Sequence, residues 1–417
     1  MNRAAVDTTQ PNNKIVNNYP GYITDTLVGY FVGEPIVYNC DDEVVLERIN
    51  NIFEYNDEAD ENTELAKDAS IYGVAYEQLY MDEDSQLRFY HLPVEECVPV
   101  YDTSIESNLL YFIRYYVEYN IESDSQNWII EVIDADKITT FRSDWTMGIL
   151  NEIDSVKHYF GMVPIAIFKN NEEEIGDFEK VISLIDAYDA MESDNLNDFE
   201  YFTDAYLALY GYTAESEDVA EMKKNRVLLM DEGTKAEWLI KDLSGGGNET
   251  MKNRIDADIH KFSFCPNMGD KEFASNASGV AIKFKTMGTE NLVSIKERKF
   301  KKGLQMRLEL LAGIEGLLGG DFDWRDIEII FTRNIPTNDT DLANMVNALR
   351  DLVSDETLLA QLPFIDDVRA EVERLKKQRD ENKTENPFLH SDYLTLAMSK
   401  NNKQEENTSD EREIKES

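Results

Sequence analysis

Hydrophobic residues repeat at helical spacing in residues 178–209, which predicts one long amphipathic helix. Its apolar positions are Phe178, Val181, Ile182, Ile185, Tyr188, Leu196, Phe199, Phe202, Tyr206 and Leu209. The other positions of the segment are rich in Asp and Glu, so the predicted helix has an apolar side and an acidic side. An acidic side usually faces solvent, but in a ring it would face a channel or a neighbouring subunit.

A second helical pattern consists of two segments joined by a loop. Residues 248–264 predict a helix closed by Pro266, because proline cannot continue a helix. After the loop 265–278, residues 279–318 predict a helix of about ten turns that ends before Gly319. A compact enzyme rarely needs so long a helix. A ring or channel subunit does, because its helix must span a shared wall.

The spacing of apolar residues changes from helical to alternating in the region between the N-terminal helices and the first long helix. Helices are predicted at 19–32, 41–55 and 62–72. From residue 73 to 170, segments rich in Tyr, Ile, Val and Phe alternate with polar positions and predict half-buried sheet. Within this region, VAYEQLYM and QLRFYHL flank the turn DEDS and predict a hairpin.

Three further strands are predicted outside this region. Residues 226–230 and 236–240 flank the turn DEGT, and the flexible segment SGGGN follows them. Residues 324–332 predict one more strand. We expect it to pair with the β-rich region, because a lone strand leaves its backbone groups unpaired.

The two ends of the chain differ from its middle. Helices are predicted at 339–353, capped by Asp339 or Thr340, and at 363–380. Residues 1–18 are polar and expected to be loose. The chain becomes polar after Asn386 and is expected to be disordered there.

The charge balance restricts the possible functions. The chain has 83 acidic and 41 basic residues among 417, a net charge of −42. This charge argues against a protein that holds nucleic acid by surrounding its phosphates with Lys and Arg. It is compatible with simple solubility, and also with an acidic surface that repels phosphate. The length allows two or three domains.

Motifs for catalysis, metal binding or membrane insertion are absent from the sequence. The 4 histidines lie far apart and lack HxxH or HExxH spacing, so we expect no metal and no cofactor. No phosphate loop and no GxSxG occur, so we expect no enzyme activity. The 3 scattered cysteines indicate a reducing compartment. No secretion signal or membrane span is expected.

One basic cluster contrasts with the acidic background. It comprises Lys283, Lys285, Lys296, Arg298, Lys299, Lys301, Lys302 and Arg307. These cations could pair with acids of a neighbouring helix. They could instead contact phosphates, as a few positive rings in a mostly negative channel. Both interpretations stay open, because in a ring each helix lies against the next subunit.

Several segments, in order, resemble the portal proteins of tailed bacteriophages of the siphophage type. IHKFSFCPNM, DKEFASNASGVAIKFK and ERKFKKGL resemble the stem helix, tunnel loop and kinked helix of that family. NNKIVNNYPGYITDTLVGYFVGEPI resembles its N-terminal signature, and HYFGMVPIAIFKNN the end of its wing domain. VISLIDAYDAMESDNLNDFEYFTDAYLALYG resembles its first stem helix, and SDETLLAQLPFIDDVRAEVERL its crown. The resemblance covers roughly residues 12 to 380.

The resemblance implies an α+β portal fold with a β-rich wing, long stem helices, a small α/β clip, a kinked long helix and a helical crown. The expected N-terminal half comprises a flexible arm at 1–18, the first part of the wing at 19–177, the first stem helix at 178–211 and the clip at 212–247. The second stem helix is expected at 248–264, the tunnel loop at 265–278, and the kinked helix with a wing strand at 279–338. Crown helices at 339–385 and a disordered tail at 386–417 complete the chain.

The resemblance also implies which residues meet DNA or a neighbouring subunit. The tunnel loop residues Asn267, Met268, Asp270, Lys271, Glu272 and Phe273 are expected to line the DNA channel. Charges expected in the channel or between subunits are Asp186, Asp189, Asp194, Lys283, Lys285, Lys296, Arg298 and Lys299.

The implied function is a homo-oligomeric ring of about twelve subunits at one vertex of the phage head. Double-stranded DNA would pass through the ring into the head and later out of it. The expected partners are the terminase large subunit, a head-completion or adaptor protein, the scaffolding protein and the major capsid protein, with no membrane. The expected location is the virion, after assembly in the host cytoplasm. The alternative is an acidic cytosolic enzyme with a β-rich and a helical domain.

Overall fold

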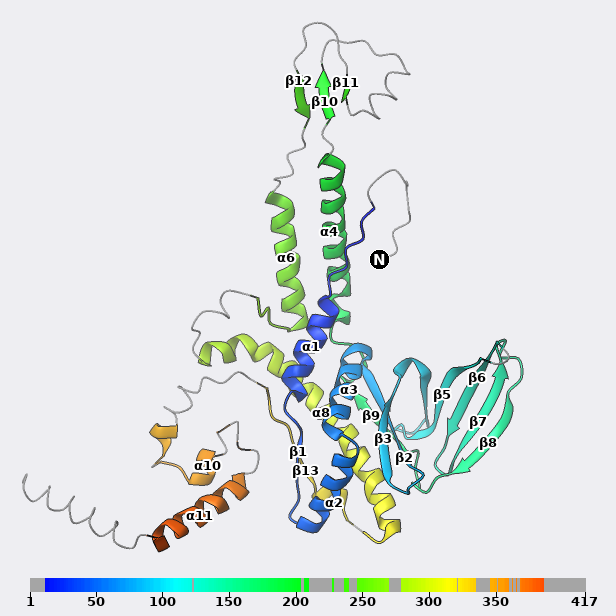
Figure 1. The fold of residues 1–417 in the computed structure, drawn as a ribbon, viewed down its shortest axis with the longest axis vertical. Helices are drawn as coiled ribbons and strands as arrows, with labels where there is room; N and C mark the ends of the chain where they lie inside the picture. Colours follow the sequence, from blue (N-terminus) through cyan, green and yellow to red (C-terminus); the bar gives the residue numbers. More distant parts are fainter. Residues whose placement is uncertain are drawn as a thin grey trace, which may run out of the picture. The chain divides into compact units, whose positions relative to one another are not determined.

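The structure is a computed structural model of mixed helices and sheets, most of whose strands pair antiparallel (Figure 1). It describes residues 12–121, 124–203, 206–209, 227–228, 236–239, 246–269, 279–320, 322–334, 346–350, 352–359, 362, 365 and 368–385. Contacts divide the chain into two units, Met1–Ile335 and Pro336–Ser417. The first unit contains the long helices and the sheets. Mixed helix and sheet agrees with the predicted α+β class.

The N-terminal helices follow the predicted pattern closely. Helix α1 spans Tyr19–Val32, and the side chain of Asn18 caps it by accepting from the Gly21 backbone N–H. Helix α2 spans Glu43–Tyr55 with Asp42 as its cap. Helix α3 spans Glu58–Tyr72, four residues longer at its start than predicted, and ends at Gly73, whose φ of 85° favours glycine.

Two sheets form the β-rich region. Strands β2 (Val74–Met81), β3 (Leu87–Leu92) and β9 (Ile165–Lys169) form a sheet in the order β3-β2-β9, which confirms the predicted hairpin. After η1 (Val94–Glu96), strands β4 (Cys97–Tyr101), β5 (Leu109–Asn120), β6 (Ser125–Ile133), β7 (Lys137–Asp144) and β8 (Asn151–Lys157) form an antiparallel meander. Phe112 and Ile133 of the meander pack with Tyr76 and Ile165 of the smaller sheet in one buried cluster.

Helices α4 and α6 lie side by side and lead to a small sheet (Figure 1). After η2 (Glu179–Val181), α4 spans Ile182–Thr203, and α6 spans Gly246–Ser263. The sheet has the order β11-β10-β12, with β10 at Tyr206–Leu209, β11 at Val227–Leu228 and β12 at Ala236–Leu239. The prediction of one helix over 178–209 was therefore wrong at its end, because residues 206–209 pair as a strand with β12.

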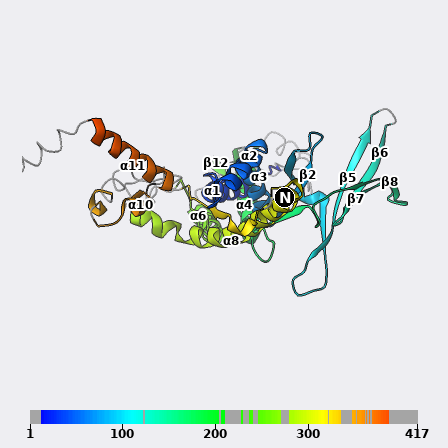
Figure 2. The ribbon, with the colours of Figure 1, turned by 90° about the horizontal axis from the view of Figure 1, so that it is seen from below.

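Helix α8 spans Gly279–Leu318 and is the longest described helix. Its side chains Val293, Phe300, Leu304, Leu308 and Leu311 are buried in the main core. The helix packs against β9 and α1, and Figure 2 shows it on one side of the unit with α1, α2 and α3 on the opposite side. The predicted helix of residues 279–318 is confirmed.

The predicted strand at 324–332 needed two corrections. Residues Trp324–Asp326 form the short helix η3, and the strand β13 spans only Glu328–Ile330. It pairs antiparallel with β1 (Val37–Asn39) in a two-stranded sheet, and not with a sheet of residues 73–170. The pairing instead joins the segment after α8 to the segment after α1.

The second unit contains α10 (Asp355–Leu359) and α11 (Val368–Glu385). Helix α11 begins later and ends later than the predicted helix at 363–380. Of the helix predicted at 339–353, residues 346–349 are helical, while the cap residues Asp339 and Thr340 lie outside the described residues. The tail 386–417 also lies outside them. Among the described residues, no helix combines the length and apolarity needed to cross a membrane.

Candidate functional site

The start of the loop between α6 and α8 is fixed to two other helices. The Phe264 carbonyl accepts from Thr289 Oγ1 of α8 at 2.6 Å. The Tyr22 hydroxyl of α1 donates to the Pro266 carbonyl at 2.8 Å and accepts from the Met268 backbone N–H at 2.9 Å. These bonds position residues 264–268 as the base of the loop, with the Met268 side chain exposed.

Only part of the predicted tunnel loop belongs to the described structure. Asn267 accepts from the Gly269 backbone N–H at 2.9 Å, which closes a tight turn. Asp270, Lys271, Glu272 and Phe273 lie outside the described residues. The structure therefore locates the loop's base but not the residues expected at its tip.

An aromatic and acidic cluster lies beneath the loop base and joins α1, α4 and α6. Tyr19 donates its hydroxyl proton to Asp256 Oδ1 at 2.6 Å. Its ring packs edge-on against Tyr188 of α4 and His260 of α6. Burial, together with the bond to Asp256, raises the pKa of Tyr19 well above its usual value. The cluster thus holds the start of α1 against both α4 and α6.

Residues 12–18, here called the N-terminal strap, run along α4 and correct the expectation that they are loose. The Asn13 backbone N–H donates to Asn197 Oδ1 at 2.7 Å. The Ile15 N–H donates to Ser193 Oγ at 3.0 Å. Asn17 donates to Asp189 Oδ1 at 2.9 Å from both its backbone and its side-chain nitrogen. Residues 1–11 lie outside the described residues.

The N-terminal strap covers one part of the acidic side of α4 and leaves another part exposed. Asp186 and Asp194 are exposed, as the prediction of a charged surface requires. Asp189 is buried, with 4% of its surface exposed, and accepts from the strap. It is therefore an internal hydrogen-bond acceptor, and the prediction of Asp189 as a channel or intersubunit charge is corrected. Lys252 of α6 pairs with Glu192 of α4 at 2.7 Å and ties the two helices together.

Arg307 of α8 is the centre of a buried ionic network. Its guanidinium is fully buried and donates twice to Glu77, at 2.8 Å from Nε and 2.7 Å from Nη2. It also donates to Glu58 Oε1 at 3.1 Å, and Glu58 accepts from the Tyr38 hydroxyl at 2.5 Å. Burial raises the pKa of Glu77, and the charge of Arg307 only partly opposes this.

Lys296 of α8 is likewise internal. Its ammonium donates to Asp177 Oδ2 at 2.5 Å and to Ser70 Oγ at 2.6 Å. Asp177 also accepts from Asn170 Nδ2 at 2.9 Å. The prediction of Lys296 as a channel or intersubunit charge is corrected, because a cation 3% exposed and bound within its own chain faces neither. The pairing with acids of a neighbouring helix expected for this basic cluster is confirmed for Arg307, which pairs with Glu58 of α3, whereas Lys296 pairs with Asp177 in the segment before η2.

The other predicted cations of α8 lie nearer the surface. Lys299 pairs with Glu172, and this bond lowers the pKa of Glu172. Arg298 is exposed and donates through Nε to the Ser294 carbonyl at 3.0 Å. Lys285 is exposed, and the Lys283 side chain lies outside the described part of the chain. The structure therefore separates one basic cluster into internal and external members.

Comparison with known proteins assigns a family to this arrangement. The family described as phage portal protein, SPP1 Gp6-like, matches residues 1–385. This chain belongs to that portal protein family. It is 24% identical to the portal protein of Bacillus phage SPP1 over 397 residues, covering 90% of this chain and 78% of that relative. It is 24% identical to the portal protein of Clostridium phage phiCD119 over 413 residues, covering 92% and 88%.

The resemblance drawn from the sequence motifs is thereby confirmed at the level of the family. What the motifs did not reveal is the set of acids that this portal-family chain uses internally. Glu58, Glu77 and Asp177 hold the cations of α8, yet nothing in the sequence separates them from the other acidic residues. The N-terminal strap was also missed, although its asparagines are typical capping and bridging residues.

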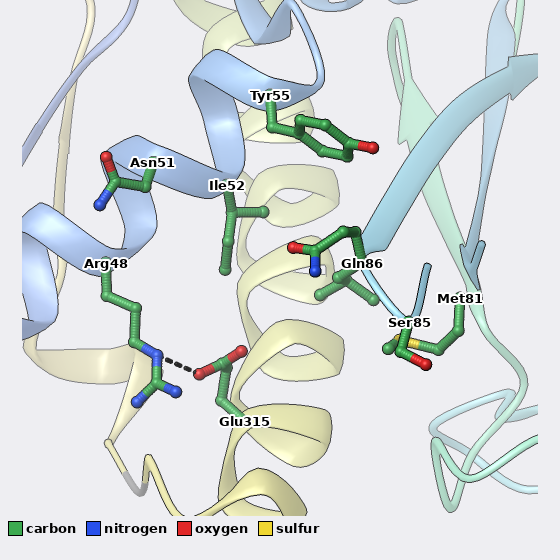
Figure 3. A pocket seen from close by; sticks show the side chains of 9 residues that line it. Arg48, Asn51, Ile52, Tyr55, Met81, Ser85, Gln86 and Glu315 are labelled. Carbon is green, nitrogen blue, oxygen red and sulfur yellow. Dashed lines mark ion pairs between the residues drawn. The ribbon is translucent and has the colours of Figure 1, made fainter. Parts of the chain in front are cut away.

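An open cavity of about 290 Å³ lies between α2, the β2–β3 hairpin and the end of α8 (Figure 3). Arg48 Nε and Glu315 Oε2 form an ion pair at 2.5 Å on one side, and Tyr55 and Gln86 line the other. Its lining contains no nucleophile beside a base. Among the described residues no group of three or more His, Cys, Asp or Glu side chains is placed to hold a metal ion.

Proposed function

We propose that this portal-family chain is one subunit of a ring whose central channel passes double-stranded DNA into a phage head and out of it again. The family match over residues 1–385 carries this proposal. The pair α4–α6, topped by a small sheet, supports it, because such a projection has too little apolar surface to form a compact domain alone (Figure 1).

In this proposal, each part of the fold has a role. The sheets of residues 74–169 form the wing, α4 and α6 form the stem, and α8 is the long helix below the channel loop. The stem helix is α4 at Ile182–Thr203, shorter than the predicted 178–211. Residues 212–247 form the clip, which docks the terminase large subunit and then a head-completion or adaptor protein. The helices of 339–385 form the crown.

The proposed ring has about twelve subunits, joined by heterologous contacts that close on themselves. It assembles in the host cytoplasm with scaffolding and major capsid proteins and becomes part of the virion. Its role is structural, and the motor that drives packaging is a different protein. The alternative of an acidic enzyme receives no support from the family match or from the lining of the cavity at Arg48 and Glu315.

The size of the purified protein tests the ring. Light scattering should give a mass many times the 48.0 kDa of one chain, and electron micrographs should show rings with a central hole. A protein that stays monomeric at all concentrations and salts, including in assembly extracts, would exclude the ring.

The loop variant D270A/K271A/E272A tests the channel. It should form rings of unchanged size, because exposed loop charges contribute within about 0.5 kcal/mol to stability. It should package or retain less DNA with the cognate motor in vitro. Normal packaging and retention would refute a role of the loop in the channel, and a failure to form rings would make the loop structural instead.

The acidic side of α4 gives a second test of the channel. Asp186 and Asp194 are the exposed members of the predicted set, so the variant D186K/D194K should make the assembly hold DNA in a salt-sensitive way. The matched charge change D136K/D154K, on the meander of β4–β8, should not. Equal DNA affinity of the two variants at low salt would remove α4 from the channel wall.

A further inference from the structure

One surface of α8 is left exposed by the described residues of the chain. Phe284, Met287 and Ile295 are 72%, 56% and 47% exposed, although large apolar side chains on a helix are normally buried. Asn291, Arg298 and Lys302 are also exposed and continue the same line at spacings of three or four residues, which places all of them on one face. We call these residues the outer stripe: Phe284, Met287, Asn291, Ile295, Arg298 and Lys302.

The outer stripe points away from the core of the first unit. The opposite side of α8 carries Val293, Phe300 and Leu304, all buried in the main core. The next exposed position on the same line, Glu309, is acidic, so the stripe ends at Lys302. Within the described part of the chain, neither Arg298 nor Lys302 has a carboxylate within ion-pair distance, in contrast to Lys299, which pairs with Glu172. The stripe thus has three apolar residues, one asparagine and two basic residues, on a chain of net charge −42.

Helix α2 presents the opposite chemistry. Its exposed residues Glu43, Glu47, Asn50, Asn51 and Glu54 recur at helical spacing, and we call them the acidic face. The exposed Val44 adds an apolar group beside them. The other side of α2 is turned inward, where Ile49 and Phe53 are buried and Arg48 reaches Glu315 of α8. The acidic face therefore points outward.

The two surfaces lie on opposite sides of the same unit. Figure 2 shows α8 along one side and α2 along the other, with the core between them. A second copy placed beside the first, in the same orientation, brings the outer stripe of one copy to the acidic face of the next. Such a contact is heterologous, since each copy uses two different surfaces, and repetition of it generates a ring when the rotation closes.

We infer that the outer stripe of α8 is a subunit interface that packs on the acidic face of α2 of a second copy of this chain. This inference rests on the proposed ring and names the surfaces that join it. The charge of the chain favours a second copy as the partner that covers the outer stripe. Two chains of −42 repel, and a contact that brings positive charge to negative charge offsets this repulsion. The outer stripe supplies the cations, and every copy carries the matching acids.

The test uses charge reversal in the full-length chain. R298E/K302E changes the stripe, E43K/E47K changes the acidic face, and the quadruple variant exchanges both. K157E/K180E is the matched control for R298E/K302E, because both variants change two exposed cations to glutamate and lower the net charge equally. The association of each variant is measured by light scattering across a concentration series at low and at high salt.

Each double variant of the interface should weaken association at low salt at least about tenfold, whereas the control should assemble like the wild type. The quadruple variant should regain association, because its opposite charges meet again with exchanged signs. That rescue also shows that the single-surface variants fold. Raised salt should weaken wild-type association and reduce the defect of the variants.

Two results would overturn the inference while leaving the ring intact. The first is a stripe variant that forms rings like the control but loses DNA, which would assign the stripe to phosphates. The second is a quadruple variant that assembles no better than its two parents. If the wild type and the control both stay monomeric, the proposed function fails, and the inference fails with it.

Discussion

The inner and outer sides of α8 carry the same residue types with opposite surroundings. On the inner side, Lys296 and Arg307 are buried and bound to Asp177, Glu58 and Glu77 of the same chain. On the outer side, Arg298 and Lys302 are exposed. Lys296 and Arg298 are two positions apart, about half a turn of the helix, so the first is part of the fold and the second is available to another molecule. In this chain, the side of α8 on which a basic side chain lies decides whether it pairs within the fold or stays exposed.

The inner cations are found with acids because burial makes an unpaired charge very costly. Arg307 joins α3 and β2 to α8, and Lys296 joins α3 and the segment before α4 to the same helix. The long helix therefore holds together the sheets and the base of the pair α4–α6. An exposed cation has no such constraint, because water solvates it.

The largest effect is expected from breaking the inner network at Arg307. R307M should destabilise the chain by about 3–5 kcal/mol, because Glu77 is left fully buried without its counter-charge. R142M, which removes an exposed pair with Glu118, should cost no more than about 1 kcal/mol. Denaturant unfolding compares the two. Equal costs would show that the buried network does not support the fold.

Lys296 is expected to give the next largest effect. K296M leaves Asp177 with Asn170 as its remaining side-chain partner and should destabilise the chain by about 3 kcal/mol. The matched variant K299M removes a pair whose acid, Glu172, is 75% exposed, and should cost about 0–1 kcal/mol. A smaller loss for K296M than for K299M in thermal and denaturant unfolding would contradict the distinction between inner and outer cations.

Local signals predicted most of the elements because their causes are local. Pro266 and Gly319 mark the ends of α6 and α8, and the turn between β2 and β3 follows from its polar residues. The strand β10 was missed because Tyr206 and Leu209 continue the apolar spacing of α4. Its pairing with β12 is a long-range contact that periodicity cannot express.

The site was less predictable than the fold, because the charge of a residue does not reveal whether its side chain points into the core or toward solvent. With 83 acidic residues in the chain, no pattern selects Glu77 and Asp177 as the buried partners of α8. In the sequence, nothing distinguishes Asp189 from Asp186 and Asp194. In the structure, the N-terminal strap covers Asp189 and donates hydrogen bonds to it. Conversely, the outer stripe could have been found by asking which positions of α8 combine apolar and basic residues at helical spacing.

The pH dependence of the inner network gives a smaller and more specific test. Burial raises the pKa of Glu77, so the folded chain binds this proton more tightly than the unfolded chain does. Stability from this group is present below the unfolded pKa and is lost as pH rises through the folded pKa. The wild type should therefore lose stability relative to E77Q as pH rises above about 4.5, by at most about 1.4 kcal/mol per pH unit.

E61Q is the control for that measurement, since Glu61 lies nearby but pairs with the partly exposed His91 instead of Arg307. Unfolding in a series of buffers at constant ionic strength gives both curves. A difference between wild type and E77Q that stays constant from acid to neutral pH would show that Glu77 does not titrate within this range.

The smallest effect on stability is expected on the outer side of α8. R298A/K302A removes two exposed cations without introducing new charge and should change the free energy of unfolding by no more than about 0.5 kcal/mol. Alanine is a good helix former, so the helix itself is not weakened. If the outer stripe is a subunit interface, the same variant should nevertheless associate more weakly than the wild type at low salt. Unfolding is measured on the dissociated chain and association by light scattering. A large loss of stability would mean that the outer cations support the fold as the inner ones do, and the contrast between the two sides of α8 would be lost.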